Sequence, residues 1–316
     1  MRVFQNLFLI LGVILLCCTS RSKSNETKLN GQYITVLGIA QDAGFPQINC
    51  DKDCCKAFYN GEESKKLVSC LGLVDLKNQK KYIFDATPDF TQQVQDLKAN
   101  HLDNGTVVDG VFLTHAHIGH YTGLMYLGFE AMDAKKIPVY AMPRMKAYLE
   151  TNGPWDQLVS MNNIEIRKLQ NDSTIVLGND LKVTPFLVPH REEYSETVGY
   201  KIEGQHKSLL FIPDINKWEL WERKIVEEVK NVDYAFLDAT FFKDGEISRP
   251  MKDVPHPFMV ETVKLFENES VDTKSKIYFV HLNHTNPALK ETNRLKDSIQ
   301  NLGFNFAKEG MTLSLD

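Results

Sequence analysis

The chain has 316 residues, with 36 Lys and Arg against 41 Asp and Glu, so its formal charge is −5, and 43% of its residues are hydrophobic and 24% charged. These values are typical of a globular protein and exclude a disordered chain or a small disulfide scaffold. Because the sequence contains no block of Lys and Arg, its charge does not favour nucleic-acid binding, which needs a clustered basic face. A small-molecule or peptide substrate is expected instead.

The first residues predict export rather than a part of the fold. Residues 3–16 are almost wholly apolar and follow Arg2, which is typical of a secretory signal and is short for a transmembrane helix of roughly 20 residues. Cys17 and Cys18 come next, and a polar stretch follows. This arrangement resembles a bacterial lipoprotein signal in which Cys18, preceded by the smaller Cys17, carries the lipid. The alternative is an ordinary cleaved signal.

The expected organisation is therefore a signal over residues 1–18, a polar tether over 19–29 and one domain over 30–316. Lipidation at Cys18 would place the protein at the periplasmic or cell-surface face of a membrane, held there by its N-terminal lipid anchor. No internal repeat or linker rich in Pro, Gly or Ser divides the domain.

Strand-like and helical segments in the domain form two strand-rich halves, each closed by helices. Such a pattern favours two sheets packed on one another with helices outside. The expected strands are 33–40, 70–76, 81–85, 110–114, 181–188, 197–203, 208–212, 233–237 and 277–280. The expected helices are 121–132, 217–229, 257–267 and 286–301.

Three histidines lie on one loop between an apolar strand and a helix. His115, His117 and His120 follow strand 110–114 directly. Zinc and iron accept neutral imidazole nitrogen, and this irregular spacing allows two rings to bind one ion and the third ring to bind its neighbour. The alternative is three exposed or hydrogen-bonded histidines. Three of the nine histidines on a single loop favour a metal centre.

The same loop resembles the His-x-His-x-Asp-His signature of the metallo-β-lactamase superfamily, and further motifs of that superfamily follow along the chain. The resemblance implies an α/β protein with an αββα sandwich, in which two mixed sheets pack face to face with helices outside. It implies that Asp85 braces the metal loop from behind the ligands, and that Asp214 bridges two ions and takes part in catalysis. The implied metal ligands are His115, His117, His120, His190, Asp214 and His281.

Within the superfamily, the chain resembles the pyrroloquinoline-quinone biosynthesis protein B group. The motifs that carry this resemblance are FDATPD at 84–89, VPHR at 188–191 and HLNHTNP at 281–287. Two features differ from what the group leads one to expect. The three loop histidines are all present here although the group typically degrades that loop, and the export signal does not fit a biosynthesis that acts on a cytoplasmic peptide.

One position departs from the superfamily signature itself, because Gly119 stands where the signature has Asp. The second ion would then lack a carboxylate ligand, and an attacking water would lack an orienting acceptor. On this interpretation Gly119→Asp restores a ligand and raises the occupancy of the second ion.

A second candidate metal site is the Cys-x3-Cys-Cys stretch formed by Cys50, Cys54 and Cys55. In the groups that the chain resembles, a stretch rich in cysteine binds a structural zinc, and His284 is a candidate fourth ligand here. The alternative is a disulfide, which an oxidising exported compartment favours. Cys50 would then pair with either neighbour, or one of the three with Cys70.

Two residues near His190 are candidates for substrate binding. Arg191 can hold an anionic group through its planar fork, although it can equally pair with the glutamates that follow it. Tyr194 lies on the same turn. His256, between two prolines, is expected to be a loop residue without a metal role.

Together these features predict a metal-dependent hydrolase in which water, activated by one or two zinc ions, cleaves an ester, phosphodiester or amide bond. Iron or manganese are the alternative metals. Two other functions are weighed against this one: an iron-dependent oxygenase or hydroxylase, which histidine and carboxylate ligands with open positions also support, and a non-catalytic metal-binding lipoprotein.

Overall fold

The computed structural model of the chain describes residues 30–178, 180–251, 254–290 and 293–316. The expected signal, the tether up to residue 29 and the Cys18 lipidation site lie outside these residues. Among the helices that are described, none combines the length and the apolar character needed to cross a membrane.

The described residues form two mixed sheets of seven strands each. The first sheet has the order β14 (Thr312–Ser314), β1 (Gln32–Gly38), β2 (Cys70–Asp75), β3 (Lys80–Phe84), β4 (Gly110–Phe112), β5 (Ile137–Ala141) and β6 (Ile164–Lys168). The second has the order β13 (Asn305–Phe306), β12 (Ile277–Val280), β11 (Tyr234–Asp238), β10 (Ser208–Ile212), β9 (Val198–Glu203), β8 (Lys182–Leu187) and β7 (Ile175–Val176).

The two sheets repeat one topology. From β14 to β3 the neighbouring strands are antiparallel, and from β3 to β6 they are parallel. The second sheet changes in the same way, with antiparallel pairs from β7 to β10 and parallel pairs from β10 to β13. Parallel strands end at the same edge of a sheet, so the segments that follow β3, β4, β10, β11 and β12 can meet at one rim.

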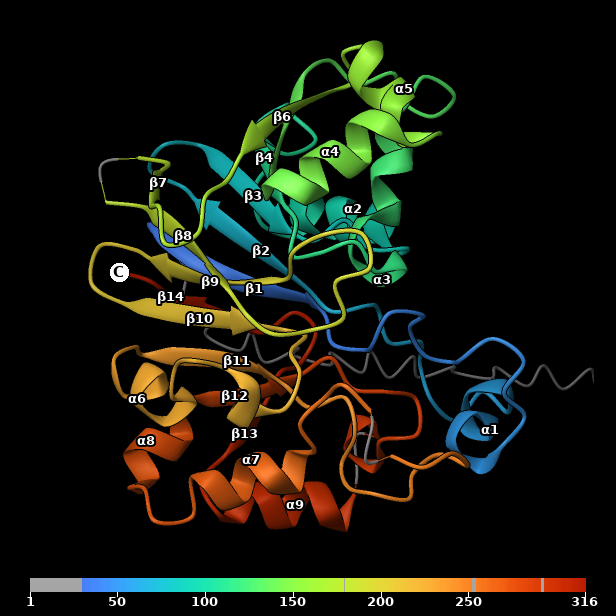
Figure 1. Cartoon of the computed structure of the whole chain (residues 1–316), viewed down its shortest axis with the longest axis vertical. Coiled ribbons are helices and arrows are strands. Elements are labelled where there is room, and N and C mark those ends of the chain that lie inside the picture. Colours follow the sequence, from blue (N-terminus) through green and yellow to red (C-terminus); the bar gives the residue numbers. More distant parts are fainter. Residues whose placement is uncertain (1–29, 179, 252–253, 291–292) are drawn as a thin grey trace, which may run out of the picture.

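Helices cover the outer face of each sheet. Figure 1 shows one helical layer beside the first sheet and a second layer beside the second sheet. The first layer contains α2 (Phe90–Asn100), α3 (Ile118–Tyr121), η1 (Thr122–Leu127), α4 (Pro143–Thr151) and α5 (Trp155–Ser160). The second contains α6 (Ile225–Lys230), α7 (Met259–Leu265), α8 (Val271–Ser275) and α9 (Arg294–Asn301). The remaining elements are α1 (Asp53–Tyr59), η2 (Trp218–Leu220) and η3 (Pro287–Leu289).

The two sheets meet face to face through aromatic side chains. Phe84 of the first sheet stacks on its neighbour Phe112, with ring centroids 5.0 Å apart, and also contacts Tyr200 and Phe211 of the second sheet at 5.3 and 6.2 Å. The Tyr200 hydroxyl donates a hydrogen bond to the Leu113 carbonyl across the interface. The predicted αββα sandwich with two mixed sheets is therefore confirmed.

Fully buried strands were the most predictable elements. The runs SLLFI and IYFV form β10 and β12 with the predicted bounds, because short apolar runs are typical of strands covered on both faces. The helix predicted over 121–132 is wrong. This segment is the short α3 followed by the 3₁₀ helix η1, and a Cβ atom at Gly123 would lie 2.2 Å from the Thr87 carbonyl oxygen, so the chain passes too close for a larger residue.

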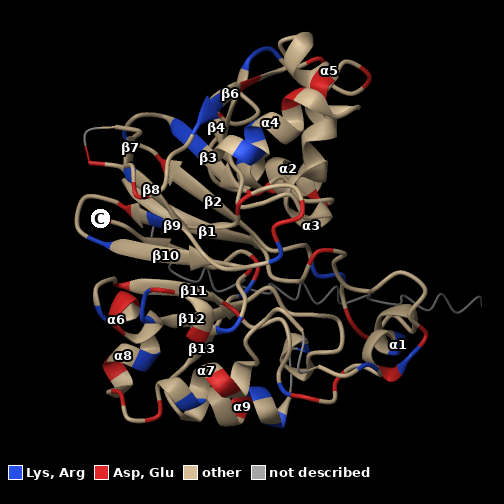
Figure 2. Cartoon of the chain, viewed as in Figure 1, with Lys and Arg blue, Asp and Glu red and all other residues tan. Residues whose placement is uncertain are grey.

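Charged residues are spread over the whole fold. Figure 2 shows Lys and Arg interspersed with Asp and Glu in both helical layers and along the strands. This mixture is what the small net charge of −5 leads one to expect.

The interface between the sheets can be tested with Phe84→Ala. Loss of this buried ring should lower the free energy of unfolding by about 3–5 kcal/mol, because a cavity remains among its aromatic neighbours. Phe129, which is 59% exposed, provides the control, and Phe129→Ala should change stability by less than about 0.5 kcal/mol. Denaturant unfolding measures both values, and equal losses would contradict a core between the sheets.

Candidate metal centre

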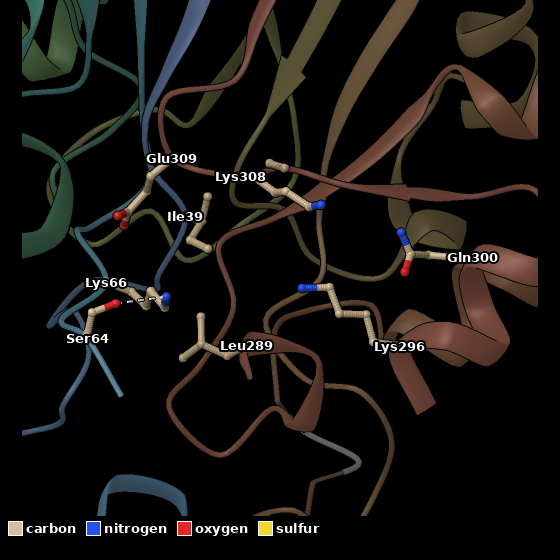
Figure 3. A pocket seen from close by; sticks show the side chains of 9 residues that line it. Ile39, Ser64, Lys66, Leu289, Lys296, Gln300, Lys308 and Glu309 are labelled. Atoms are coloured by element: carbon tan, nitrogen blue, oxygen red, sulfur yellow. Dashed lines mark hydrogen bonds between the residues drawn. The ribbon is translucent and has the colours of Figure 1, made fainter. Parts of the chain in front are cut away.

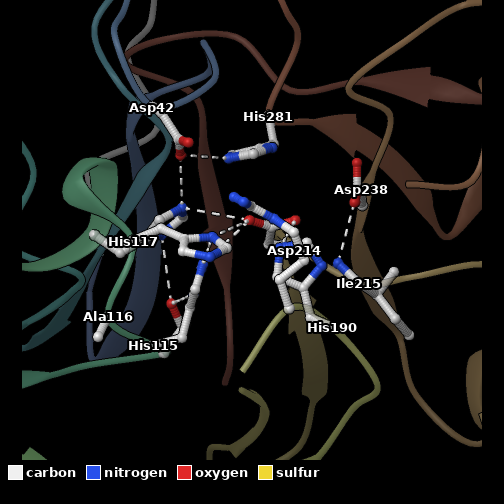
Figure 4. Close-up of polar contacts among 12 residues, drawn as sticks. Asp42, His115, Ala116, His117, His190, Asp214, Ile215, Asp238 and His281 are labelled. Carbon is white, nitrogen blue, oxygen red and sulfur yellow. Dashed lines mark hydrogen bonds and ion pairs between the residues drawn. The ribbon is translucent and has the colours of Figure 1, made fainter. Parts of the chain in front are cut away.

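The predicted metal ligands follow strands whose ends lie at one rim of the sandwich. The loop with the three histidines follows β4, His190 follows β8, Asp214 follows β10 and His281 follows β12. Figure 4 shows five of these side chains pointing toward a common centre from both sheets, namely His115, His117, His190, Asp214 and His281, and His120 belongs to the same cluster. The structure therefore brings all six predicted ligands together.

A first group of potential ligands consists of His115, His117, His190 and Asp214, whose nearest ligand atoms lie within 4.8 Å of one another. His115 Nε2 lies 3.2 Å from Asp214 Oδ2, and His190 Nε2 lies 3.2 Å from Asp214 Oδ1. His115 Nε2 is 2.8 Å from His117 Nδ1. Three imidazoles and one carboxylate form a donor set that zinc accepts.

A second group shares Asp214 with the first and adds Asp42, His120 and His281. His120 Nε2 lies 3.1 Å from Asp42 Oδ1 and 3.8 Å from Asp214 Oδ2. His281 Nε2 lies 3.4 Å from the same Asp42 oxygen. Asp214 therefore lies between the two groups, at the position expected of an acid that bridges two ions.

Several buried polar atoms at this centre have no hydrogen-bond partner. They are both ring nitrogens of His190, Oδ1 of Asp214 and Nε2 of His281. Most buried polar groups in proteins are hydrogen-bonded, and leaving one unpaired is costly. His190, Asp214 and His281 therefore bring atoms with lone pairs to the same centre, and these atoms form no hydrogen bonds with one another. The residues present fit a metal centre.

Asp85 and Thr114 hold the first-sheet histidines in place. Asp85 accepts hydrogen bonds from the Thr114 backbone N–H at 2.8 Å and the Thr114 hydroxyl at 3.0 Å, and its Oδ2 lies 2.7 Å from His120 Nδ1. The same hydroxyl lies 3.0 Å from His115 Nδ1. Because the Nδ1 atoms are engaged in this way, the Nε2 atoms of both rings are left to face the centre. Asp85, which the resemblance implies to brace the metal loop, thus contacts both Thr114 and His120.

The second sheet holds its ligand in the same manner. Thr240 Oγ1 lies 2.9 Å from His281 Nδ1 and donates a hydrogen bond to Asp238 Oδ1 at 2.7 Å. His281 and Asp85 both adopt left-handed backbone angles, with φ of 64° and 70°. Non-glycine residues in that conformation are strained and often lie at functional sites, where the surrounding structure holds them.

The charges of the centre favour ionised carboxylates but do not act alike on the imidazoles. Although burial opposes it, Asp85 and Asp42 raise the pKa of His120 well above its usual value. Burial alone would raise the pKa of Asp214, but His190 and His256 outweigh it and hold this pKa well below its usual value. Asp42 behaves in the same way, because the neighbouring rings of His120 and His281 overcome its burial and hold its pKa well below the usual value. Burial lowers the pKa of His115 and keeps its ring neutral, as metal binding requires.

His256 was predicted to be a loop residue without a role at the metal site, and this prediction is wrong. Its Nδ1 lies 3.1 Å from Asp214 Oδ1 and 2.9 Å from Asp238 Oδ2, and the ring is buried. Although burial acts in the opposite direction, Asp238 and Asp214 raise the pKa of His256 to about 10. The loop before α7 brings this ring to the centre, and its two flanking prolines gave no sign of that.

Two further residues of the centre were not predicted from the sequence. Asp238 is the last residue of β11, and an acid that ends an apolar strand was a usable signal. Asp42 lies on the loop after β1 and belongs to no motif of the three-histidine loop, so no sequence pattern indicated its position.

Two of the three cysteines that were predicted to bind a structural zinc lie close enough to share one ion. Cys50, Cys54 and His284 offer ligand atoms within 4.8 Å of one another, and this group does not include Cys55. The sulfur atoms of Cys50 and Cys54 are 3.5 Å apart, which exceeds the roughly 2.05 Å of a disulfide bond, and the four described cysteines are free. The arrangement favours the structural-zinc interpretation with His284 as a ligand.

The thiols of this stretch differ in acidity. Burial opposes ionisation of Cys50, but a hydrogen bond from the Lys52 backbone and contacts with the neighbouring thiols lower its pKa below the ordinary value. Burial raises the pKa of Cys55 to about 12. Since the thiolate is the form that binds metal, Cys50 is the better ligand of the two.

The two predicted substrate-binding residues lie in different surroundings. Arg191 lines a hollow beside the metal centre, together with Arg249, Asn283 and His256. Tyr194 is exposed and is absent from this lining, and its ring packs against Tyr148 with centroids 5.3 Å apart. Arg191 Nη1 also lies 3.2 Å from Glu193 Oε1, which is the pairing expected as the alternative. The hollow is compatible with a binding role for Arg191 and does not support one for Tyr194.

Another hollow lies elsewhere on the molecule and contains none of the residues of the metal centre. Figure 3 shows its lining, which combines three lysines with polar and apolar side chains: Ile39, Ser64, Lys66, Leu289, Lys296, Gln300, Ala307, Lys308 and Glu309. It has no imidazole or thiol, so it does not offer the ligands of a transition metal.

The sandwich and the cluster of histidines and aspartates at its rim define a class of protein, and comparison with known proteins identifies it. The model of the beta-lactamase superfamily domain matches residues 80–310. The chain therefore belongs to the metallo-β-lactamase superfamily.

Among curated proteins, the chain is 26% identical over 306 residues to coenzyme PQQ synthesis protein B of Gluconobacter oxydans, covering 90% of this chain and 98% of that protein. It is 24% identical over 310 residues to the protein of the same name from Methylorubrum extorquens, covering 90% and 100%. The predicted similarity to that group is thus confirmed.

Solved structures show the same fold. Zn²⁺-bound PqqB from Methylobacterium extorquens superposes with a TM-score of 0.74 at 24% identity, covering 90% of this chain and all of that one. A diphosphatase of the PhnP family gives a TM-score of 0.64 at 22% identity, covering 89% and 96%. Human tRNase Z, short form, gives 0.56 at 14% identity, covering 90% and 99%.

The cysteine site can be tested with Cys54→Ala. Loss of one ligand should release one zinc ion per chain and lower the melting temperature, because structural zinc contributes directly to folding stability. Cys55→Ala is the matched control, and it should retain the ion since Cys55 lies outside the ligand group. Elemental analysis of both variants decides. An unchanged zinc content in Cys54→Ala, with a disulfide seen by mass spectrometry of the unreduced protein, would contradict the site.

Proposed function

We propose that this protein is a metal-dependent hydrolase in which water, activated by one or two bound ions, cleaves an ester, phosphodiester or amide bond. The observation that carries the proposal is the position of Asp214, a buried carboxylate between two groups of imidazoles, of which His190 and His281 have buried ring nitrogens without hydrogen-bond partners. When bound there, a divalent ion lowers the pKa of its water toward about 7 and polarises a substrate oxygen.

The residues of the chain prepare the centre for that chemistry. His115, His117 and His190 would hold one ion, and His120 and His281 would hold a second, with Asp214 between them. Thr114 and Thr240 fix the orientation of the rings. The His256 ring lies against Asp214 and lines the hollow beside the centre, so it would be placed to exchange a proton with water or a leaving group there.

Zinc is the proposed metal, with iron or manganese as alternatives. The donor set consists of imidazole and carboxylate groups, which suit zinc and also suit iron. The similar structure of PqqB from Methylobacterium extorquens is described as Zn²⁺-bound, which supports zinc.

The substrate is proposed to carry an anionic group. Arg191 and Arg249 line the hollow beside the centre, and the planar guanidinium matches the geometry of phosphate and carboxylate oxygens. Among proteins of the same fold are a diphosphatase and a tRNase, which supports a phosphate ester within the proposed range of substrates. The interspersed positions of Lys and Arg with Asp and Glu along the chain support a small-molecule or peptide substrate rather than a nucleic acid.

His190→Ala tests the hydrolase. Both His190 ring nitrogens lack hydrogen-bond partners, so the substitution removes a ligand without breaking a hydrogen bond. We expect the loss of one ion per chain and a fall of at least about a hundredfold in hydrolysis, since metal ions contribute several kcal/mol to such barriers. The control is His206→Ala, at an exposed ring. Metal analysis and a panel of phosphodiester, thioester and lactam substrates provide the readout.

The same experiment separates the alternatives. Metal content unchanged in His190→Ala contradicts the centre itself. Iron in protein prepared without oxygen, with oxygen uptake on addition of substrate, favours an oxygenase or hydroxylase. Bound metal without turnover of any kind favours a binding lipoprotein.

We propose in addition that the protein is exported and anchored at a periplasmic or cell-surface membrane through lipid on Cys18. The support is the apolar run of residues 3–16, the small residue before Cys18 and the polar stretch that follows.

The lipid anchor predicts a mature chain that begins at Cys18 and carries acyl groups. Mass spectrometry of the N-terminal peptide from membrane fractions measures this directly, and Cys18→Ser with Cys17 intact should release the protein from the membrane. Cys17→Ser is the control. An unmodified terminus beyond residue 18 would mean that the protein is not a lipoprotein.

A further inference from the structure

We infer that Asp42, on the loop after β1, supplies the carboxylate ligand of the second ion that Gly119 fails to provide. The metal-binding part of the proposed function is assumed here, but hydrolysis is not. Asp42 and Gly119 are 77 residues apart in the chain and lie next to each other in the fold.

The geometry around Asp42 is that of a ligand. Its Oδ1 lies 3.1 Å from His120 Nε2 and 3.4 Å from His281 Nε2, on the side of both rings that faces the centre. Its carboxylate also belongs to the group that includes Asp214 within 4.8 Å. Figure 4 shows the Asp42 carboxylate directed at the His281 ring. His281 Nε2 is buried and has no hydrogen-bond partner.

Gly119 leaves the space that Asp42 fills. A Cβ atom at residue 119 would lie 2.4 Å from the Asp42 Cα and 2.5 Å from its Oδ1, closer than atoms can approach without a shift of the backbone. Gly119 is not among the glycines with positive φ, so the close approach, rather than the backbone angle, requires glycine here. A carboxylate on the histidine loop and the observed position of Asp42 therefore exclude one another.

The Asp42 loop is tied directly to the segment that carries His281. Gln41 donates a backbone hydrogen bond to the Leu282 carbonyl at 2.9 Å, and Leu282 donates one to the Ile39 carbonyl at 2.9 Å. These bonds place Asp42 beside His281 through the backbone of both segments. The position of the carboxylate is thus built into the fold and does not depend on a flexible surface chain.

With Asp42 included, the second donor set has two imidazoles and two carboxylates: His120, His281, Asp42 and Asp214. This is the composition that the signature would give with an acid at residue 119. The earlier expectation that Gly119→Asp restores a missing ligand is therefore revised, because no carboxylate is missing and the new side chain would displace Asp42.

Asp42→Asn is the central test, since it keeps the shape of the side chain and removes its charge. We expect one ion fewer per chain than in the unaltered protein, or a second ion bound more than about a hundredfold more weakly, which exceeds the 10–100-fold typical of losing a group behind the ligands. His281→Ala should lose the same ion. Asp51→Asn, at an exposed acid, should lose none.

Gly119→Ala provides a second, independent variant because it removes no ligand. Its methyl group should push the Asp42 loop aside and weaken the second ion, and Gly119→Asp should give no gain in bound metal. Zinc per chain and titration calorimetry of metal-free protein give the readout, with circular dichroism to confirm folding. These results do not require turnover, so a protein that binds two ions and hydrolyses nothing would still support the inference.

Three results would overturn it. The first is a second ion that binds with unchanged affinity in Asp42→Asn while His281→Ala loses it. The second is a gain of metal in Gly119→Asp. The third is an unaltered protein that binds only one ion at this centre under saturating zinc.

Discussion

The burial of Asp214 among imidazoles is the constraint on which the rest of the site depends. An ionised carboxylate is costly to remove from water unless positive charge and hydrogen-bond donors surround it. Here His115, His190 and His256 approach both of its oxygens, and one oxygen still has no hydrogen-bond partner. The fold tolerates such a group because the rims of two sheets converge on it and fix every neighbour. A bound cation would supply what the protein atoms leave incomplete.

The repeated topology of the two sheets explains how the neighbours are fixed. In the first half Asp85 and Thr114 orient the loop histidines from behind. In the second half Thr240 does the same for His281 and is itself held by Asp238, which also contacts His256 Nδ1. Each half therefore places an acid and a threonine at the ends of parallel strands, with the imidazole Nδ1 atoms held by them. The candidate metal centre thus lies between two similar sets of supporting residues. The Nε2 atoms of the supported rings face Asp214 and are left to bind ions.

The sequence predicted the ligands that follow strands and missed those that arrive by other routes. His115, His190, Asp214 and His281 each come shortly after an apolar run, so the strand pattern and the superfamily motifs locate them together. The two-sheet core was predictable for the same reason, since buried strands such as β10 are continuous apolar runs. His256 could not be located, because its place depends on the path of an irregular loop. Comparing the motif position by position suggested that Gly119 leaves the site without a carboxylate. In the fold, the carboxylate of Asp42 occupies the space next to Gly119 and comes from another part of the chain.

The two donor sets differ in a way that bears on chemistry. The first contains three imidazoles with the shared Asp214, whereas the second contains two imidazoles with Asp42 and the same shared acid. Two divalent ions facing only the carboxylates of Asp42 and Asp214 would leave the centre with net positive charge. Arg249, which lines the adjoining hollow, adds to that charge, whereas the charge of Arg191 is paired with Glu193. A centre of this kind would stabilise hydroxide and attract anionic groups through the same field, because low-dielectric walls concentrate it. The carboxylate at residue 42 therefore affects more than metal retention: without it the second ion would face stronger repulsion from the first, and a site for a pair of ions would become a site for one.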